Sequence, residues 1–130
     1  MTEIIPYLFY RDLPAALDWL ARAFGFVEEM RTVTPSGGMH AEMSFGGQRI
    51  MMGQPTGAAH EAVGSSPLLV GGASMGVFIY LQDVDAHHAR AGAAGAAISA
   101  PPHDVPYGRT YTARDAEGHP WFFTTPPSGR

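Results

Sequence analysis

The sequence contains no cysteine, which excludes disulfide bonds, thiolate nucleophiles and zinc or iron–sulfur sites built from cysteine. It also lacks any run of basic residues, because its 8 basic side chains are scattered singly and the net charge is -4. A nucleic-acid partner is therefore not expected, since binding to phosphates requires a concentration of positive charge.

Long apolar stretches are missing as well. No segment reaches the roughly 20 apolar residues that span a bilayer, and the N-terminus lacks a basic segment followed by an apolar signal core. We therefore expect a cytoplasmic protein with no membrane partner. The 130 residues, of which 45% are hydrophobic and 15% charged, suit a single soluble domain over residues 1–130 with one core.

What the sequence does contain is an internal repeat. Gly47 and Gly118 each lie in a turn that precedes an apolar strand, and a fixed separation between such stretches is the signature of a duplicated structural unit. The same separation relates three further pairs: Met51 and Phe122, Pro55 and Pro126, and Asp12 and Asp83.

The first copy, residues 3–53, begins with a β-rich stretch over residues 4–10. Asp12 then offers an N-cap, and apolar residues recur at helical spacing until Gly25, which suits a C-cap. Three strands are predicted to follow, over residues 26–34, 39–45 and 48–52.

The second copy, residues 75–127, repeats this order. Asp83 offers an N-cap to a weaker helix, whose apolar face is mostly alanine. Residues 100–108 contain three prolines and are predicted to form a loop that cannot pair. Residues 54–74 are predicted to be a linker and covering loop, and residues 128–130 a loose tail. The strands of this copy are predicted over residues 76–81, 97–99, 109–113 and 119–125.

The repeat predicts an α+β fold. Each copy has one strand, one helix and then three strands, and two such units bury their sheet faces by packing the helices outside and curving the sheets toward one another. We therefore expect a concave, apolar interior.

Four stretches carry a resemblance to a known family: Ile5-Pro6-Tyr7-Leu8-Phe9-Tyr10-Arg11-Asp12, Ala23-Phe24-Gly25-Phe26, His40-Ala41-Glu42-Met43 and Arg114-Asp115-Ala116-Glu117-Gly118-His119-Pro120-Trp121. Together they resemble the glyoxalase/bleomycin resistance/dioxygenase superfamily, also called the vicinal oxygen chelate fold, and within it the PhnB-like and bleomycin-resistance-like members. The resemblance covers residues 3–127. It implies two βαβββ modules, residues 3–53 and 75–127 joined by loop 54–74, that form a half-open, cup-shaped barrel, usually in a homodimer.

The resemblance also implies where a metal would be held. Enzymes of this superfamily bind a divalent metal through one ligand from the first strand and one from the last strand of each module. Carried over to this sequence, the four positions are Ile5, Met51, Gly76 and Phe122. None of these side chains can ligate such a metal. We therefore expect no metal and no other cofactor.

The residues that face the interior are predicted from the alternation of side chains along each strand. Aromatic rings and a methionine on a concave sheet suit a planar organic ligand, although any single ring can equally fill the core. Tyr107 and Arg109 are expected at the mouth, and Trp121 is expected to pack under the helices. The predicted ligand-binding residues are Tyr7, Phe9, His40, Met51, Phe78, Tyr80, Tyr107, Arg109, Tyr111 and Phe122.

His40 and Glu42 share one face of their strand, and the repeat places Tyr111 opposite His40. On an interior face, this pair suits acid–base chemistry or ligand recognition, so both residues are candidate catalytic residues. The alternative is a hydrogen-bonded pair on an exposed or dimer-facing surface. Of the adjacent histidines on the second helix, His87 is expected in solvent and His88 as a packing residue.

Three functional hypotheses follow. The first, implied by the resemblance to drug-sequestering members, is metal-free binding and sequestration of a small hydrophobic or aromatic molecule, as in antibiotic resistance. The second is an enzyme of the same superfamily, of lyase, isomerase or dioxygenase type, that uses a relocated metal or His40 and Glu42. The third is a purely structural or regulatory dimer. The apolar metal positions favour a binding protein over an enzyme.

Overall fold

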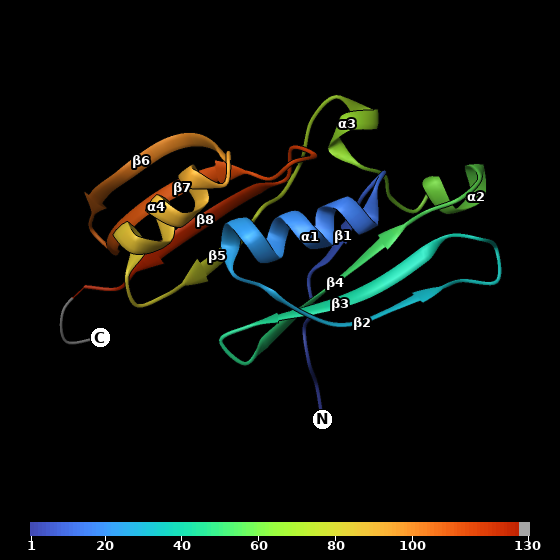
Figure 1. Ribbon diagram of the computed structural model, residues 1–130, viewed down its shortest axis with the longest axis horizontal. Coiled ribbons are helices and arrows are strands. Elements are labelled where there is room, and N and C mark those ends of the chain that lie inside the picture. Colours follow the sequence, from blue (N-terminus) through green and yellow to red (C-terminus); the bar gives the residue numbers. More distant parts are fainter. Residues whose placement is uncertain (128–130) are drawn as a thin grey trace.

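The computed structural model describes residues 1–127, which form two four-stranded sheets (Figure 1). The strand order is β1-β4-β3-β2 in one sheet and β5-β8-β7-β6 in the other. In each sheet the first strand runs parallel to the last, and the other neighbours are antiparallel. The repeat therefore predicted the topology correctly, while the tail expected at 128–130 lies outside the described residues. The strands are β1 (Tyr7–Phe9), β2 (Val27–Val33), β3 (Met39–Phe45), β4 (Gln48–Gln54), β5 (Val77–Tyr80), β6 (Ala97–Val105), β7 (Gly108–Arg114) and β8 (Pro120–Thr125).

The two long helices begin where the sequence predicted. In α1 (Leu13–Phe24), the Asp12 carboxylate accepts a hydrogen bond from the Ala15 amide at 3.2 Å, and Gly25 ends the helix with a φ of 85°. Such a left-handed conformation costs little only for glycine. In α4 (Val84–Ala93), Asp83 caps the first turn in the same way. Among the described residues, no helix has the length and apolar character needed to cross a bilayer.

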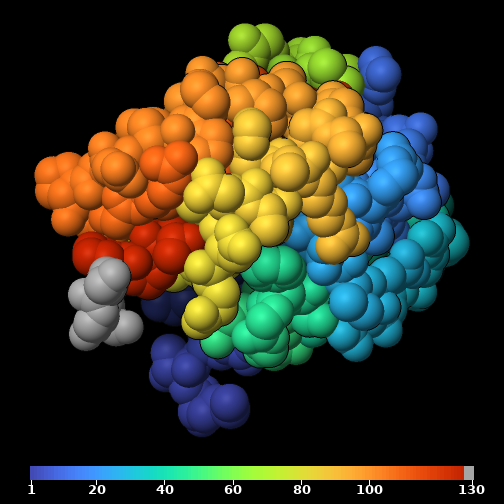
Figure 2. Space-filling model, turned by 60° about the vertical axis from the view of Figure 1, so that its left-hand side comes forward, coloured from blue at the N-terminus to red at the C-terminus, as the bar shows by residue number. Residues whose placement is uncertain are grey.

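The core lies between the helices and the inner faces of the sheets. Because α1 packs against α4, the helical sides of both modules merge into one apolar core. Figure 2 shows the yellow and light-orange residues around α4 against the blue and green residues of the first module. The Phe24 ring lies 5.4 Å from the Trp121 ring and 4.8 Å from the Phe123 ring, between centroids, and all three are fully buried. Trp121 thus packs under the helices as predicted.

The turn between β7 and β8 fastens the second module to the first. The buried Asp115 accepts hydrogen bonds from the Tyr10 hydroxyl at 2.6 Å and from the Trp121 indole at 3.1 Å. The buried Glu117 accepts from the backbone amides of Arg11 and Asp12 at 2.6 and 2.8 Å. These carboxylates therefore fix the junction between β1 and α1 from the opposite module.

The prediction of an unpaired loop at residues 100–108 was wrong. Most of this stretch belongs to β6 (Ala97–Val105), which pairs with β7. β6 is the outermost strand of its sheet, so its outer edge needs no hydrogen-bond donor. The ladder shifts register between Ala100 and His103, and the two prolines at 101 and 102 lie within this irregular part. Prolines are tolerated at an edge and at a bulge, which is where this strand places them.

The linker between the modules carries two short helices that the sequence did not predict. These are α2 (Ala58–Glu61) and α3 (Pro67–Val70). Ser66 caps α3 through its hydroxyl, which accepts from the Leu68 amide at 3.2 Å. Each helix has only 4 residues, which is why helical periodicity gave no signal for them.

Within residues 1–127 the two sheets do not close into one barrel. Each sheet buries one face against the helices and leaves the other face open: Leu8 is 6% exposed and its neighbour Tyr7 45%, while Trp121 is 0% exposed and Phe122 38%. One chain therefore presents two open sheet faces rather than the single concave interior that we predicted. The candidate site must be sought on these faces.

Candidate functional site

The open face of the first module carries a cluster of aromatic and imidazole rings. Tyr7 and Phe9 extend from β1 with their ring centroids 5.2 Å apart, and His40 lies opposite on β3. The Tyr7 hydroxyl is 3.0 Å from the Nδ1 atom of His40, and the two rings stack at 5.6 Å with an interplanar angle of 25°. Partial burial raises the pKa of Tyr7. The structure therefore brings three of the predicted ligand-binding residues together.

These rings line a pocket of about 750 Å³, a size typical of small-molecule sites. We call it the module-1 pocket. Gly53 forms part of it, and a Cβ atom at this position would lie 2.5 Å from the Tyr7 hydroxyl oxygen. The glycine therefore allows the phenol to lie flat against β4. No aspartate, glutamate or arginine side chain lines the module-1 pocket, whose lining is Tyr7, Phe9, Thr34, Pro35, Ser36, Gly38, Met39, His40, Gly53, Gln54, Pro55, Thr56, His60 and Val63.

The open face of the second module carries a group of four exposed rings. We call Phe78, Tyr80, Tyr107 and Phe122 the aromatic cluster. Its centre is Phe78, whose ring centroid lies 5.0 Å from Tyr80, 6.2 Å from Tyr107 and 6.4 Å from Phe122. All four side chains are between 38% and 49% exposed. Large contiguous apolar patches on soluble proteins are typical of contact surfaces, which makes this cluster a candidate for one.

The four positions that the family resemblance assigns to a metal do not fit one. Met51 lies in β4 and Phe122 in β8, on the open faces, while Ile5 and Gly76 lie just before β1 and β5. A Cβ atom on Gly76 would lie 2.8 Å from the Phe122 ring, so this ring fills the space beside the glycine. Within residues 1–127, no group of three or more histidine, aspartate or glutamate residues is placed to hold a metal ion.

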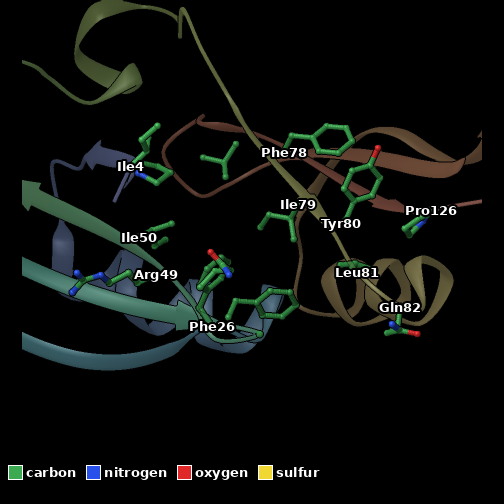
Figure 3. A pocket seen from close by; sticks show the side chains of 15 residues that line it. Ile4, Phe26, Arg49, Ile50, Phe78, Ile79, Tyr80, Leu81, Gln82 and Pro126 are labelled. Atoms are coloured by element: carbon green, nitrogen blue, oxygen red, sulfur yellow. The ribbon is translucent and has the colours of Figure 1, made fainter. Parts of the chain in front are cut away.

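A second large pocket, of about 760 Å³, lies where the two modules meet (Figure 3). Phe26 and Ile50 line it from the first module, and Ile79 and Leu81 line it from the second. These residues continue the core, and the first two are nearly buried. Phe78 and Tyr80 also line this pocket, whereas His40 and Tyr7 line the module-1 pocket and not this one. The predicted ligand residues are thus divided between two places.

His40 and Glu42 share a face but form separate pairs. His40 pairs with Tyr7, and the Glu42 carboxylate accepts a hydrogen bond from Arg49 at 2.8 Å. Arg49 also donates to Glu3 at 2.6 and 2.7 Å, and these two carboxylates raise the pKa of its guanidinium. The arrangement orients Arg49 and does not form the His–Glu pair that acid–base catalysis would use.

Tyr111 does not share the face of His40, contrary to the prediction. It is fully buried on the helical side of its sheet, where its hydroxyl lies 2.6 Å from the Nδ1 atom of His87. His87 inserts between the modules, with Nε2 2.8 Å from the Phe24 carbonyl oxygen and its ring 4.2 Å from Phe123. Burial lowers the pKa of His87. The expectation that His87 lies in solvent was therefore wrong.

Arg109 does not reach the aromatic cluster either. Its guanidinium donates to Asp85 on α4 at 3.1 Å and to Asp104 on β6 at 3.2 Å. These carboxylates raise the pKa of Arg109 and hold its guanidinium toward α4 and β6. Tyr107, which was predicted beside it at the mouth, does join the cluster through Phe78.

Two linker residues that line the module-1 pocket were not predicted as ligand-binding residues. His60 extends from α2 and Val63 follows this helix. The composition of residues 54–74 indicated a covering loop, but no periodicity indicated which of its side chains meets the sheet.

The chain matches the family model of the Glyoxalase/Bleomycin resistance protein/Dioxygenase superfamily over residues 4–123. The chain belongs to this superfamily. Among solved structures, TioX from Micromonospora sp. ML1 is 35% identical, with 99% of each chain covered and a TM-score of 0.72. An uncharacterised protein of Mycobacterium bovis is 29% identical over 93% of this chain and 81% of its own length.

A further solved structure shows the same fold at lower identity. It is TnmS3, an antibiotic binding protein from Streptomyces sp. CB03234, which is 19% identical, covers 96% of this chain and 97% of its own, and has a TM-score of 0.72. At this identity the likeness concerns the fold alone. The fold of this chain is thus shared with a protein that is described as antibiotic-binding.

Proposed function

We propose that this superfamily member binds and sequesters a small hydrophobic or aromatic molecule without a protein-bound metal. The observation that carries the proposal is that residues unable to ligate a metal occupy the four metal positions, while aromatic rings lie on both open sheet faces. Met51 and Phe122 occupy equivalent places in the two sheets, opposite Tyr7 and Phe78 in the parallel ladders. Side chains that offer rings and a thioether bind planar organic groups by stacking and dispersion.

The energetics favour a largely apolar ligand. Complete burial of one large apolar side chain stabilises a complex by about 1.5–3 kcal/mol, and each ring of the aromatic cluster has more than a third of its surface still to bury. The module-1 pocket adds hydrogen-bonding groups, including the Tyr7 hydroxyl and the His40 imidazole. A flat molecule with a few polar substituents suits both surfaces.

We further propose that the protein acts as a homodimer in which the open face of one module meets the opposite module of a second copy. The exposed aromatic cluster supports this arrangement, since contiguous exposed apolar groups are typical of protein–protein contact surfaces. Light scattering coupled to size-exclusion chromatography measures the mass directly. A monomer at concentrations well above those used for binding would contradict the dimer and leave single-chain binding to be tested.

The binding function is tested by thermal-shift screening against a panel of aromatic natural products and antibiotics. A ligand at about 100 times its Kd stabilises the folded state by about 2.7 kcal/mol, which gives a clear rise in Tm. Phe122→Ala and Tyr7→Ala should each reduce the rise. Leu69→Ala is the matched control, because Leu69 is 52% exposed on α3 and lines none of the described pockets.

Two results would overturn the proposal. One is a rise in Tm that is the same in the wild type, Phe122→Ala and Tyr7→Ala proteins, because binding would then lie elsewhere. The other is stoichiometric zinc, nickel, manganese or iron in protein purified without chelators, which would restore the enzyme hypothesis.

A further inference from the structure

We propose that residues 57–64, which we call the strap, form a hinged lid over the module-1 pocket. The inference rests on the proposed binding function and adds a moving part to it. The strap contains α2. Two of its side chains line the pocket: His60 within α2, and Val63 two residues after the end of this helix. Closure over a bound molecule would bring both side chains onto the side of the ligand that faces away from the sheet.

Both ends of the strap are anchored to the body of the protein. Before it, the Thr56 hydroxyl donates to the Ser36 carbonyl oxygen at 3.2 Å. After it, the Ser66 hydroxyl donates to Glu117 at 2.5 Å, with Ser66 only 1% exposed and Pro67 buried beside it. The first anchor lies in the lining of the module-1 pocket and the second lies at the β7–β8 turn, which leaves the residues between them to move as a unit.

The middle of the strap is not fastened to either sheet in the described structure. Residues 57–63 are all exposed, and α2 buries no side chain. The hydrogen bonds of this part are local: Glu61 N to Gly57 O, Ala62 N to Ala58 O, Val63 N to His60 O, and His60 Nδ1 with Thr56 O. The three backbone bonds stay within residues 57–63, so a rigid movement of α2 breaks none of them. Rotation about Gly57 breaks only the contact of His60 Nδ1 with the carbonyl oxygen of the anchored Thr56. Such a segment belongs to the low-stability end of a fold.

A glycine stands at each end of the strap, where a hinge would be. Gly57 has a φ of 81° and a ψ of 158°, a combination that is essentially restricted to glycine. Gly64 lies so close to the Phe9 ring that a Cβ atom would collide with it. Gly57 can therefore rotate without a steric clash. Gly64 packs against Phe9, which lines the module-1 pocket.

The geometry of the strap also gives its inner side a chemical character. Val63 is 79% exposed, which leaves an apolar side chain at the pocket rim with nothing to cover it. The His60 ring uses Nδ1 for the Thr56 carbonyl oxygen, which leaves Nε2 as the ring atom available to a ligand. A closed lid would therefore place an apolar contact and one hydrogen-bonding atom opposite Tyr7 and His40.

Limited proteolysis with a glutamate-specific protease tests the lid, using 8-anilinonaphthalene-1-sulfonate as the probe. Glu61 is exposed within the strap, and Glu3 lies in an irregular segment outside the lining of the module-1 pocket. Saturating probe should slow cleavage after Glu61 about tenfold, because cleavage follows the population of the open form. Cleavage after Glu3 should keep its rate and serves as the internal control.

Two variants separate a lid from a merely nearby loop. Val63→Ser should raise the dissociation rate of the probe about fivefold and reduce the protection of Glu61, because the closed form loses its apolar contact. The matched control is Leu69→Ser on α3, an exposed linker residue outside the pocket lining, which should change neither quantity. Equal effects of the two substitutions would overturn the lid.

The outcomes also separate the lid from the binding function. Probe fluorescence that rises on binding and is lost in Tyr7→Ala, together with unchanged cleavage after Glu61, would overturn the lid and leave the binding site intact. A probe and a compound panel that both fail to bind would overturn the proposed function and the lid with it.

Discussion

We predict that Glu117→Gln strongly destabilises the fold although it keeps the number of non-hydrogen atoms and changes the volume very little. The Glu117 carboxylate accepts hydrogen bonds from the amides of Arg11 and Asp12 and from the Ser66 hydroxyl, and the residue is 5% exposed. Glutamine replaces one acceptor oxygen with an NH2 donor. Whichever way the amide turns, its NH2 group faces a backbone N–H, so at least one buried donor loses its acceptor.

The magnitude follows from the charged character of these bonds. A hydrogen bond to a charged group contributes about 1.5–3 kcal/mol, and an unsatisfied buried donor adds its desolvation cost, so we expect a loss of about 2–4 kcal/mol. For a domain of this size the Tm should fall by about 10 °C. Urea unfolding and calorimetry measure both quantities. The loss should spread to ligand binding, because Glu117 fixes the end of β1, which carries Tyr7 and Phe9.

The control has the same chemistry at the surface. Glu29 accepts a hydrogen bond from the Ser44 hydroxyl at 2.6 Å but is exposed, so Glu29→Gln should change stability by no more than about 0.5 kcal/mol. If Glu117→Gln behaves like Glu29→Gln, the carboxylate does not fasten the modules and our account of the β7–β8 turn fails. A double-mutant cycle with Ser66→Ala should give a coupling energy of about 0.5–3 kcal/mol.

Three further predictions concern the interior and the second sheet. Because burial holds the pKa of His87 below 6.5, the unfolded state takes up a proton first, so urea-measured stability should fall as the pH drops below about 6.5, and His87→Gln should flatten that slope. Tyr111→Phe should cost about 1–3 kcal/mol, since the Phe24 carbonyl fixes the proton on Nε2 of His87 and Nδ1 then loses its donor. Arg109→Ala should leave thermal-shift responses to ligands unchanged, because Asp85 holds its side chain away from the cluster. Loss of the response would restore Arg109 as a ligand residue.

The elements with strong local signals were predictable from the sequence. An aspartate N-cap, an apolar stripe and a glycine C-cap set the bounds of α1, and the structure gives the same bounds. The repeat correctly paired Met51 with Phe122, because both occupy the same register beside the first strand of their module. These signals are local or depend on a single offset, so neither needs tertiary information.

The prediction for Tyr111 failed because the two modules differ in their last hairpin. Met51 pairs with Glu42 across β3 and β4, and Phe122 pairs with Thr112 across β7 and β8. Glu42 and Thr112 are 70 positions apart, whereas Met51 and Phe122 are 71 apart. A shift of one residue moves every side chain of a strand to the other face. Tyr111 therefore falls on the helical side, and the sequence alone could not reveal the change in hairpin length.

The division of the site between two open faces also lay beyond the sequence. Strand alternation predicts which side chains share a face, but the placement of one sheet relative to the other depends on how α1 and α4 pack. That packing is set by buried contacts across the modules, such as the His87 ring between Phe24 and Phe123. No periodicity in either copy encodes such a contact.

The two copies of the repeat now carry different chemistry on equivalent faces. In the first module, Tyr7 and His40 present a hydroxyl and an imidazole beside a methionine in β4, and the pocket lining has no carboxylate or guanidinium. In the second module, the equivalent face presents the rings of Phe78 and Phe122 with no charged side chain between them. A molecule that contacts both faces is therefore best matched by one edge with hydrogen-bonding groups and one flat apolar surface.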